Sequence, residues 1–171
     1  GINAVELGLG SINLIVKDSC IIGTAINGNS SGNNGGGIHM IGTELLIDTC
    51  IVENNFSNMV GGGMFFNGTN LSLDNVRVFE NSSNDDGGGV YAINAIVNIT
   101  QSNVNNNVTV NNGGGLDLSL NTINTISNSI ISMDTANSGA GIYFSGNSLI
   151  VSGTDIEKNT ALLSDGGGIY A

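Results

Sequence analysis

The side chains that could do chemistry in this sequence are its carboxylates and a single histidine. Asp48 and Asp74 lie 26 positions apart, Asp85 and Asp86 are adjacent, and His39 is the sole histidine. A calcium ion needs six to eight oxygen ligands held together, and glycoside hydrolysis needs carboxylates that converge on one bond. No acidic residue recurs as it does in calcium-binding nonapeptide arrays, and no nucleophile motif lies near the histidine. We therefore expect no catalytic residue, no metal site and no cofactor.

The charge balance argues against a nucleic acid as partner. The chain has 3 Lys and Arg against 14 Asp and Glu, for a net charge of −11. Nucleic acids are bound by clustered cations that replace counterions, and the cations here, Lys17, Arg77 and Lys158, are scattered. An anionic membrane surface is disfavoured for the same reason. No apolar run approaches the roughly 20 residues that span a bilayer, so we expect no membrane insertion.

A glycine triplet recurs through the chain and sets the period of the fold. Triplets begin at residues 35, 61, 87, 113 and 166, and a Gly-Ala-Gly version begins at residue 139. The steps are 26 residues long, except for the last step of 27. A fixed period of this size is the signature of a solenoid in which each repeat is one coil. We expect the glycines at a corner where backbones approach closely and φ is positive.

Three short segments with alternating apolar residues follow one another in each repeat, which is typical of strands. In the first regular repeat they are Ile38–Met40, Leu45–Ile47 and Cys50–Val52. Equivalent segments of successive coils would pair in parallel about 4.8 Å apart, and parallel crossovers are right-handed. The sequence therefore predicts an all-β fold, a right-handed three-sided parallel β-helix with about 26 residues per coil, as one domain over residues 1–171.

Residues 1–34 are expected to form an irregular first coil. Its predicted strands are Val5–Leu7, Leu14–Val16 and Cys20–Ile22, followed by a longer loop over residues 27–34. In the regular coils, like residues stack on like in four inward columns. The predicted inward residues are Ile38, Met64, Val90, Leu116, Ile142 and Ile169; Met40, Phe66, Leu118 and Phe144; Leu45, Leu71, Val97, Ile123 and Leu149; and Val52, Val78, Val104, Ile130 and Ile156.

Two short motifs carry a family resemblance. The glycines are followed by an aliphatic residue or Met, and an aliphatic-x-x-Asn element appears at Val52–Asn55, Val78–Asn81, Val104–Asn107 and Ile156–Asn159. Together they resemble the GGA[ILV] and FxxN elements of the polymorphic outer-membrane-protein repeat, within the pectin-lyase-like β-helix group. The resemblance covers nearly the whole chain, with a third Gly in place of Ala and a β-branched residue in place of Phe. Met133 is expected to interrupt the second element. The resemblance implies a β-helix used in adhesin passengers and other surface proteins.

Two columns of side chains are candidate sites. Asn55, Asn81, Asn107 and Asn159 could form an internal ladder of amide hydrogen bonds, or they could line a binding groove. An outward column beside the glycines could stack on sugar rings or on a neighbouring subunit, or it could only stiffen the sheet. This column holds His39, Phe65, Tyr91, Asp117, Tyr143 and Tyr170, of which Phe65, Tyr91, Tyr143 and Tyr170 make the possible binding face.

Two kinds of covalent modification are also open. The chain has seven N-x-S/T sequons, three of which fall on the expected Asn ladder and should be bare. The glycosylation candidates are Asn29, Asn67, Asn70 and Asn98. Cys20 and Cys50 hold the same column in adjacent coils, so their Cα atoms should lie about 5 Å apart, within disulfide range. They form either a disulfide, which an oxidising location would favour, or a buried pair of thiols.

The whole pattern favours an extracellular or cell-surface structural protein, a rod-forming or filament-forming β-helix without catalysis. Solenoid ends are unpaired strand edges, so we expect covalent continuation into a longer solenoid or self-association end to end. The alternative is an adhesin module that binds a glycan or a receptor through the outward aromatic face. A polysaccharide lyase or hydrolase is the third reading, disfavoured by the lack of converging carboxylates.

Overall fold

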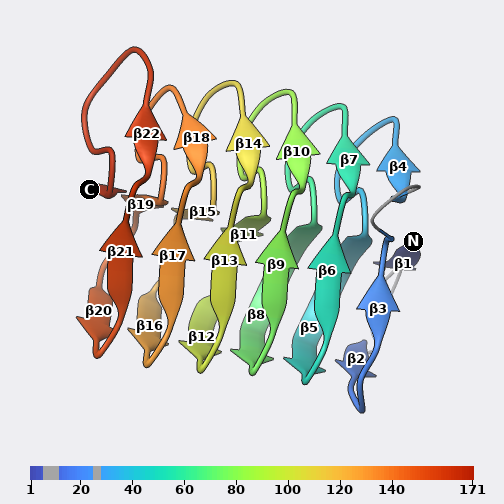
Figure 1. Cartoon of the computed structure of the whole chain (residues 1–171). Coiled ribbons are helices and arrows are strands. Elements are labelled where there is room, and N and C mark those ends of the chain that lie inside the picture. The colour runs from blue at the N-terminus through green and yellow to red at the C-terminus, as the bar shows by residue number, and fades with distance from the viewer. Residues whose placement is uncertain (6–11, 25–27) are drawn as a thin grey trace.

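The protein is a parallel β-solenoid of about six turns, as the sequence predicts. The computed structural model describes residues 1–5, 12–24 and 28–171, and these residues form strands and turns without any helix. A membrane-spanning helix is accordingly not found in this described part. In Figure 1 the chain climbs through β3 (Ile21–Ile22) and β4 (Ser30–Ser31) on the near side and returns on the far side as it advances, which is the right-handed sense.

The strands stack into three parallel sheets. The 11-stranded sheet joins the first two segments of each coil, because two of its strands run through both. Its strands are β1 (Ile2–Val5), β2 (Asn13–Val16), β5 (Ile38–Asp48), β8 (Met64–Asp74), β11 (Val90–Ile93), β12 (Ile96–Thr100), β15 (Leu116–Ser119), β16 (Ile123–Ser127), β19 (Ile142–Ser145), β20 (Leu149–Ser152) and β23 (Ile169–Tyr170).

The other two sheets have six strands each. One holds the third segment of every coil: β3, β6 (Ile51–Glu53), β9 (Arg77–Phe79), β13 (Asn103–Asn105), β17 (Ile130–Ser132) and β21 (Asp155–Glu157). The other sheet holds a fourth segment of each coil, which is only two residues long and therefore too short to show a periodic pattern in the sequence. Its strands are β4, β7 (Phe56–Ser57), β10 (Ser82–Ser83), β14 (Val108–Thr109), β18 (Thr135–Ala136) and β22 (Thr160–Ala161). Figure 1 shows both sheets as parallel rows on the near side.

Each coil turns its corners at single residues in the left-handed region. The first glycine of each triplet makes one corner, with φ of 70° at Gly61 and 61° at Gly87. The other two corners are made mostly by residues with side chains, as at Asn75 (φ 53°) and Glu80 (φ 55°). Such a conformation costs a residue with Cβ roughly 1–2 kcal/mol, so the parallel ladders on both sides must hold these corners in place.

The solenoid interior is packed with the predicted aliphatic columns. Ile38 pairs in register with Met64, which pairs with Val90, and all three are fully buried. The ladder then continues through Leu116 to Ile142. Side chains at matching places in consecutive coils therefore lie directly over one another. Ile169, also predicted inward, lies in the last strand and is 39% exposed.

The prediction that Ile123 and Ile130 point inward is wrong, and one slip in register explains both errors. Ile123 is 49% exposed and Ile130 is 41% exposed, whereas Asn124 and Ile131 point inward and are buried. Val97 pairs with Asn124, 27 residues on, because one extra residue enters the loop between β15 and β16. One residue is missing again before Ser138, so the glycine spacing stays at 26. A one-residue slip moves every side chain to the opposite face of the strand.

The first coil also differs from its prediction. Ile2 pairs with Ile38 and Ala4 with Met40, so the first strand is Ile2–Val5 and not Val5–Leu7. Residues 6 and 7 lie outside the described part of the chain. Val5 pairs with Ile41 and Asn13 with Glu44, so the extra length of this coil lies between these two pairs. The other two strands of this coil pair as predicted, Leu14 with Leu45 and Ile22 with Val52.

Candidate functional site

A column of side chains forms a hydrogen-bonded ladder inside the corner between the two six-stranded sheets, where each coil passes from its third segment to its fourth. Asn81 shows the pattern: its Oδ1 accepts hydrogen bonds from the backbone N of Asn55 at 3.0 Å and from Asn55 Nδ2 at 2.9 Å. Its own Nδ2 donates to Asn107 Oδ1 at 3.0 Å and to the Val52 carbonyl at 2.9 Å. Each rung therefore ties its coil to both neighbouring coils. The rungs are Asn29, Asn55, Asn81, Asn107, Asp134 and Asn159.

The third glycine of each triplet makes room for this ladder. A Cβ added to Gly63 would lie 3.1 Å from Asn81 Cγ and 2.6 Å from the Gly89 carbonyl oxygen. A Cβ on Gly89 would meet Asn107 Cγ at 3.1 Å and the Gly115 carbonyl at 2.6 Å. The same close approach recurs in other coils, so no side chain fits at this position. This is the position at which the chain departs from the GGA[ILV] element.

Asp134 is one of two rungs that sequence reasoning missed, the other being Asn29. Its Oδ1 accepts hydrogen bonds from the Asn107 backbone N at 2.8 Å and from Asn107 Nδ2 at 3.0 Å. Met133 was expected to interrupt the column, but it occupies the left-handed corner with φ of 57° and leaves the ladder intact. Burial raises the pKa of the Asp134 carboxyl to about 8, against the lowering effect of the two Asn107 hydrogen bonds. The sequence feature that could have revealed this rung is Ile131-x-x-Asp134, an aliphatic-x-x-Asp element that lies 27 residues after Val104–Asn107 and so one residue out of phase with the period of 26.

A hydroxyl two residues after each early rung donates a hydrogen bond to a loop carbonyl of its own coil or of the preceding coil. Ser57 Oγ donates to the Val60 carbonyl at 3.0 Å, Ser83 Oγ to the Asp86 carbonyl at 3.0 Å, and Thr109 Oγ1 to the Asp85 carbonyl at 2.6 Å. A rung Asn followed at this spacing by Ser or Thr reads as a glycosylation sequon. The corner geometry therefore accounts for the sequons at Asn29, Asn55, Asn81 and Asn107 without glycosylation.

The glycosylation candidates fall into three environments. Asn29, expected on a loop, is the first ladder rung, and its Nδ2 donates to Asn55 Oδ1 at 2.8 Å. Asn67 is partly buried and accepts a hydrogen bond from Asn94 Nδ2 at 3.2 Å. Asn70 and Asn98 are exposed on the outer face of the large sheet. These two are the sequons that the fold presents to an enzyme.

The outward column forms two short stacks of rings. His39 stacks on Phe65 with centroids 5.0 Å apart, Phe65 on Tyr91 at 5.8 Å, and Tyr143 on Tyr170 at 5.2 Å. The planes are within 10° of parallel, so the rings cover one another's faces. Phe65 is only 7% exposed. The ring faces that are turned toward one another within each stack are therefore covered.

Asp117 separates the two stacks and is itself buried. It pairs in register with Tyr91 on one side and Tyr143 on the other, and its carboxylate accepts a hydrogen bond from Ser119 Oγ. Burial raises the pKa of Asp117 to about 8, and the charges of Asp86 and Asp85 add to the effect. Burial, with Asp117 as the nearest charge, raises the pKa of Tyr91 to about 12. Asp117 is therefore mostly protonated below about pH 8.

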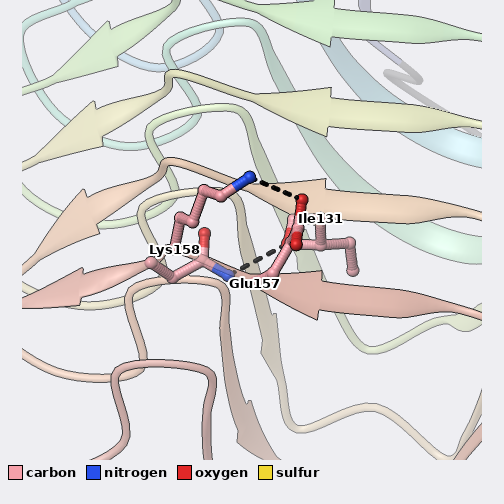
Figure 2. A network of polar contacts seen from close by, with 4 residues as sticks. Ile131, Glu157 and Lys158 are labelled. Carbon is pink, nitrogen blue, oxygen red and sulfur yellow. Dashed lines mark hydrogen bonds and ion pairs between the residues drawn. The ribbon is translucent and has the colours of Figure 1, made fainter.

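The remaining charged groups do not converge on one point. Lys158 Nζ pairs with Glu157 Oε1 at 3.1 Å at the end of β21, an exposed contact that Figure 2 shows beside Ile131 of β17. Exposed pairs of this kind contribute little to stability. Within residues 1–5, 12–24 and 28–171, no group of three His, Cys, Asp or Glu side chains could hold a metal ion.

Cys20 and Cys50 form a disulfide that joins the first coil to the second. Their Cα atoms lie 4.7 Å apart, and the two residues are 30 positions apart in the sequence. The bond lies at the start of β3 and β6, where Ile21 pairs with Ile51. Of the two states that the sequence left open, the structure has the bonded one.

Reduction of this disulfide should lower the free energy of unfolding by about 3–4 kcal/mol, because the bond closes a loop of 30 residues in the unfolded chain. Chemical denaturation with and without a reductant measures the difference. The double variant Cys20→Ser/Cys50→Ser is the control, since its unfolding midpoint must not respond to the reductant. Equal midpoints for the oxidised and reduced chain would contradict the prediction.

Comparison of the chain with protein-family models, with curated proteins and with solved structures finds no match. The structure by itself establishes a parallel β-solenoid of about six turns with a spacing near 26 residues. The residues that repeat from coil to coil are those of the interior: the aliphatic columns, the ladder and the glycines that admit it.

Proposed function

We propose that this chain is a structural shaft of an extracellular or cell-surface protein, a stiff rod without catalysis. The observation that supports it best is a contrast between the two sides of each strand. The inward position of the first strand holds Ile38, Met64 and Val90, all aliphatic or Met. The outward position next to it holds His39, Phe65, Tyr91 and then Asp117, which differ in size and charge. Similar side chains therefore recur at the inward position, where they hold the coils together. They do not recur at the outward position, where a ligand that contacts successive coils would bind.

The surface location rests on two further observations. Cys20 and Cys50 form a disulfide, and disulfides persist mainly in proteins of oxidising compartments. The glycine and aliphatic-x-x-Asn elements resemble the polymorphic outer-membrane-protein repeat, whose coils build surface proteins of the adhesin-passenger kind. Membership of that family is part of this proposal.

The partner that fits best is another solenoid coil. The end strands β20, β21, β22 and β23 pair with one neighbour only, so their other edges are templates for parallel pairing. A further coil of the same chain or the first coil of a second copy could extend all three sheets. End-to-end addition would lengthen the rod by about 4.8 Å per coil.

Electron microscopy of the purified chain tests this proposal. We expect rods of constant width that lengthen with protein concentration. Ile169→Lys places a charge at an inward position of the last strand and should abolish this growth, whereas the matched control Ile150→Lys, on an outward position of β20 in the preceding coil, should not. Compact particles with no elongation, or equal behaviour of the two variants, would contradict end-to-end assembly.

An adhesin module is the second candidate, supported by the Tyr143–Tyr170 pair of the outward column, in which Tyr170 is 37% exposed. It predicts that the monomeric rod binds a glycan or a receptor and that Tyr143→Ala or Tyr170→Ala removes the binding. Release of reducing ends from a polysaccharide would instead favour an enzyme and would contradict both readings.

A further inference from the structure

One position of the ladder is chemically unlike the others. In the rungs Asn55, Asn81, Asn107 and Asn159 the Nδ2 group lies against the third glycine of a triplet or of its Gly-Ala-Gly version, as Asn81 Nδ2 does 3.1 Å from the Cβ position of Gly63. Asp134 Oδ2 occupies the same place, 2.6 Å from the Cβ position of Gly115. The carboxyl group therefore sits in the ladder as an Asn side chain would, with an oxygen where the other rungs have an NH₂ group.

The surroundings of that place offer acceptors and no donor. Asn107 Nδ2 donates to the Val78 carbonyl, three residues before the preceding rung, and Asn159 Nδ2 donates in the same way to the Ile131 carbonyl. The carbonyl equivalent to these for Asp134 is that of Val104. Each Nδ2 group also donates to the Oδ1 of the next rung, which for Asp134 is Asn159 Oδ1. The structure gives Asp134 Oδ2 no hydrogen-bond partner, although the atom is buried.

A carboxylate at this place would hold a negative charge against oxygen atoms in a dry interior, which is a costly arrangement. A carboxylic acid would carry a proton on Oδ2 and could donate it to one of the two acceptors. Oδ1 would keep both of its hydrogen bonds from Asn107 in either state.

We propose that Asp134 stands in the ladder as a neutral carboxylic acid, and that its ionisation makes the coil around it a pH-sensitive weak point of the rod. The titratable groups on the neighbouring elements do not compete for this proton. Asp117 lies on β15 but points outward, while Asp155 and Glu157 of β21 and Lys158 after it are exposed. Glu157 and Lys158 also pair with each other.

The sign of the pH effect follows from the two states of the chain. The folded-state pKa of Asp134 is raised to about 8 by burial, whereas an unfolded Asp has a pKa of about 3.9. Between these values the folded chain holds a proton that the unfolded chain has released, so stability falls as the pH rises. The contribution is favourable below about pH 4, and its loss is complete above about pH 8.

The test compares the wild type with Asp134→Asn, which restores the NH₂ group of the other rungs. The unfolding equilibrium constant of the wild type should rise relative to that of the variant by up to tenfold per pH unit between about pH 4 and pH 8. The comparison must be made against this variant, because the buried Asp117 gives the wild type a second pH dependence. Asp155→Asn, an exposed carboxylate in the next coil, is the matched control and should leave the pH dependence unchanged.

NMR of the chain labelled at the Asp carboxyl carbons reports the protonation state of Asp134 without unfolding the protein. The Asp134 signal, assigned by its loss in Asp134→Asn, should stay at the position of a protonated acid at pH 6. A second variant, Asn81→Asp, should bring a new pH dependence of the same sign to a coil that lacks one. An ionised Asp134 at pH 6, or a stability difference between wild type and Asp134→Asn that is constant from pH 5 to pH 9, would overturn the proposal.

Discussion

Replacing Gly89 with alanine should destabilise the solenoid by about 3 kcal/mol or more. The new Cβ would lie 2.6 Å from the Gly115 carbonyl oxygen and 3.1 Å from Asn107 Cγ, with backbone on one side and a buried rung on the other. Overpacking of a filled interior costs roughly 1–3 kcal/mol, and relief by moving Asn107 would add the loss of ladder hydrogen bonds. Urea denaturation followed by circular dichroism measures the change in midpoint.

Gly32→Ala is the matched control for this substitution. A Cβ at Gly32 would meet no atom within 4 Å, and its φ is not in the left-handed region. This variant should be neutral or more stable by up to about 1 kcal/mol, because alanine restricts the unfolded chain. Similar midpoints for Gly89→Ala and Gly32→Ala would show that the coils can part at the glycine corner.

Removing one central rung should have an effect of similar size. Asn81→Ala deletes five side-chain hydrogen bonds, which run to the backbone N and Nδ2 of Asn55, to Asn107 Oδ1 and to the carbonyls of Val52 and Phe79. Each buried partner left unsatisfied costs about 1–3 kcal/mol. We therefore expect a loss of about 4 kcal/mol or more in the free energy of unfolding.

Hydrogen exchange gives this prediction a local readout. The Asn55 amide, which donates to Asn81 Oδ1 at 3.0 Å, should lose its protection in Asn81→Ala before the remote coils do. Asn84→Ala is the control, because Asn84 is exposed and its side chain only approaches Asn58 Oδ1 at 3.5 Å. Unchanged protection of the Asn55 amide would mean that the ladder does not hold neighbouring coils together.

Sequence periodicity predicted the parts of this fold that repeat without a slip. The step of 26 residues between glycine triplets placed Ile38, Met64 and Val90 in one column, because equal coils must superpose equal positions. The two-residue strands such as Phe56–Ser57 could not be predicted, since two residues are too few to show an alternation. The first strand was misplaced for a related reason: an irregular coil offers no period against which to align Ile2.

The Asp134 rung shows what a constant period conceals. The triplets at residues 113 and 139 are 26 residues apart, yet between them one residue is added and one is removed. Only the pairing of Val104 with Ile131 reveals that Ile130 and Met133 are not in phase with the rest. A side chain's face depends on its strand register, and register is a property of two paired strands that neither strand carries alone.

The sequence by itself therefore determined the solenoid, its period, its aliphatic interior and the Asn column, because each is a spacing that can be counted along the chain. Only the tertiary structure decided that Asn29 is also a rung, that Cys20 is bonded to Cys50, that the outward rings cover one another, and that a carboxyl group holds an amide's place in the ladder. These depend on contacts between coils at separations of a few ångströms, and such contacts follow from packing and register, which the spacing of residue types does not contain.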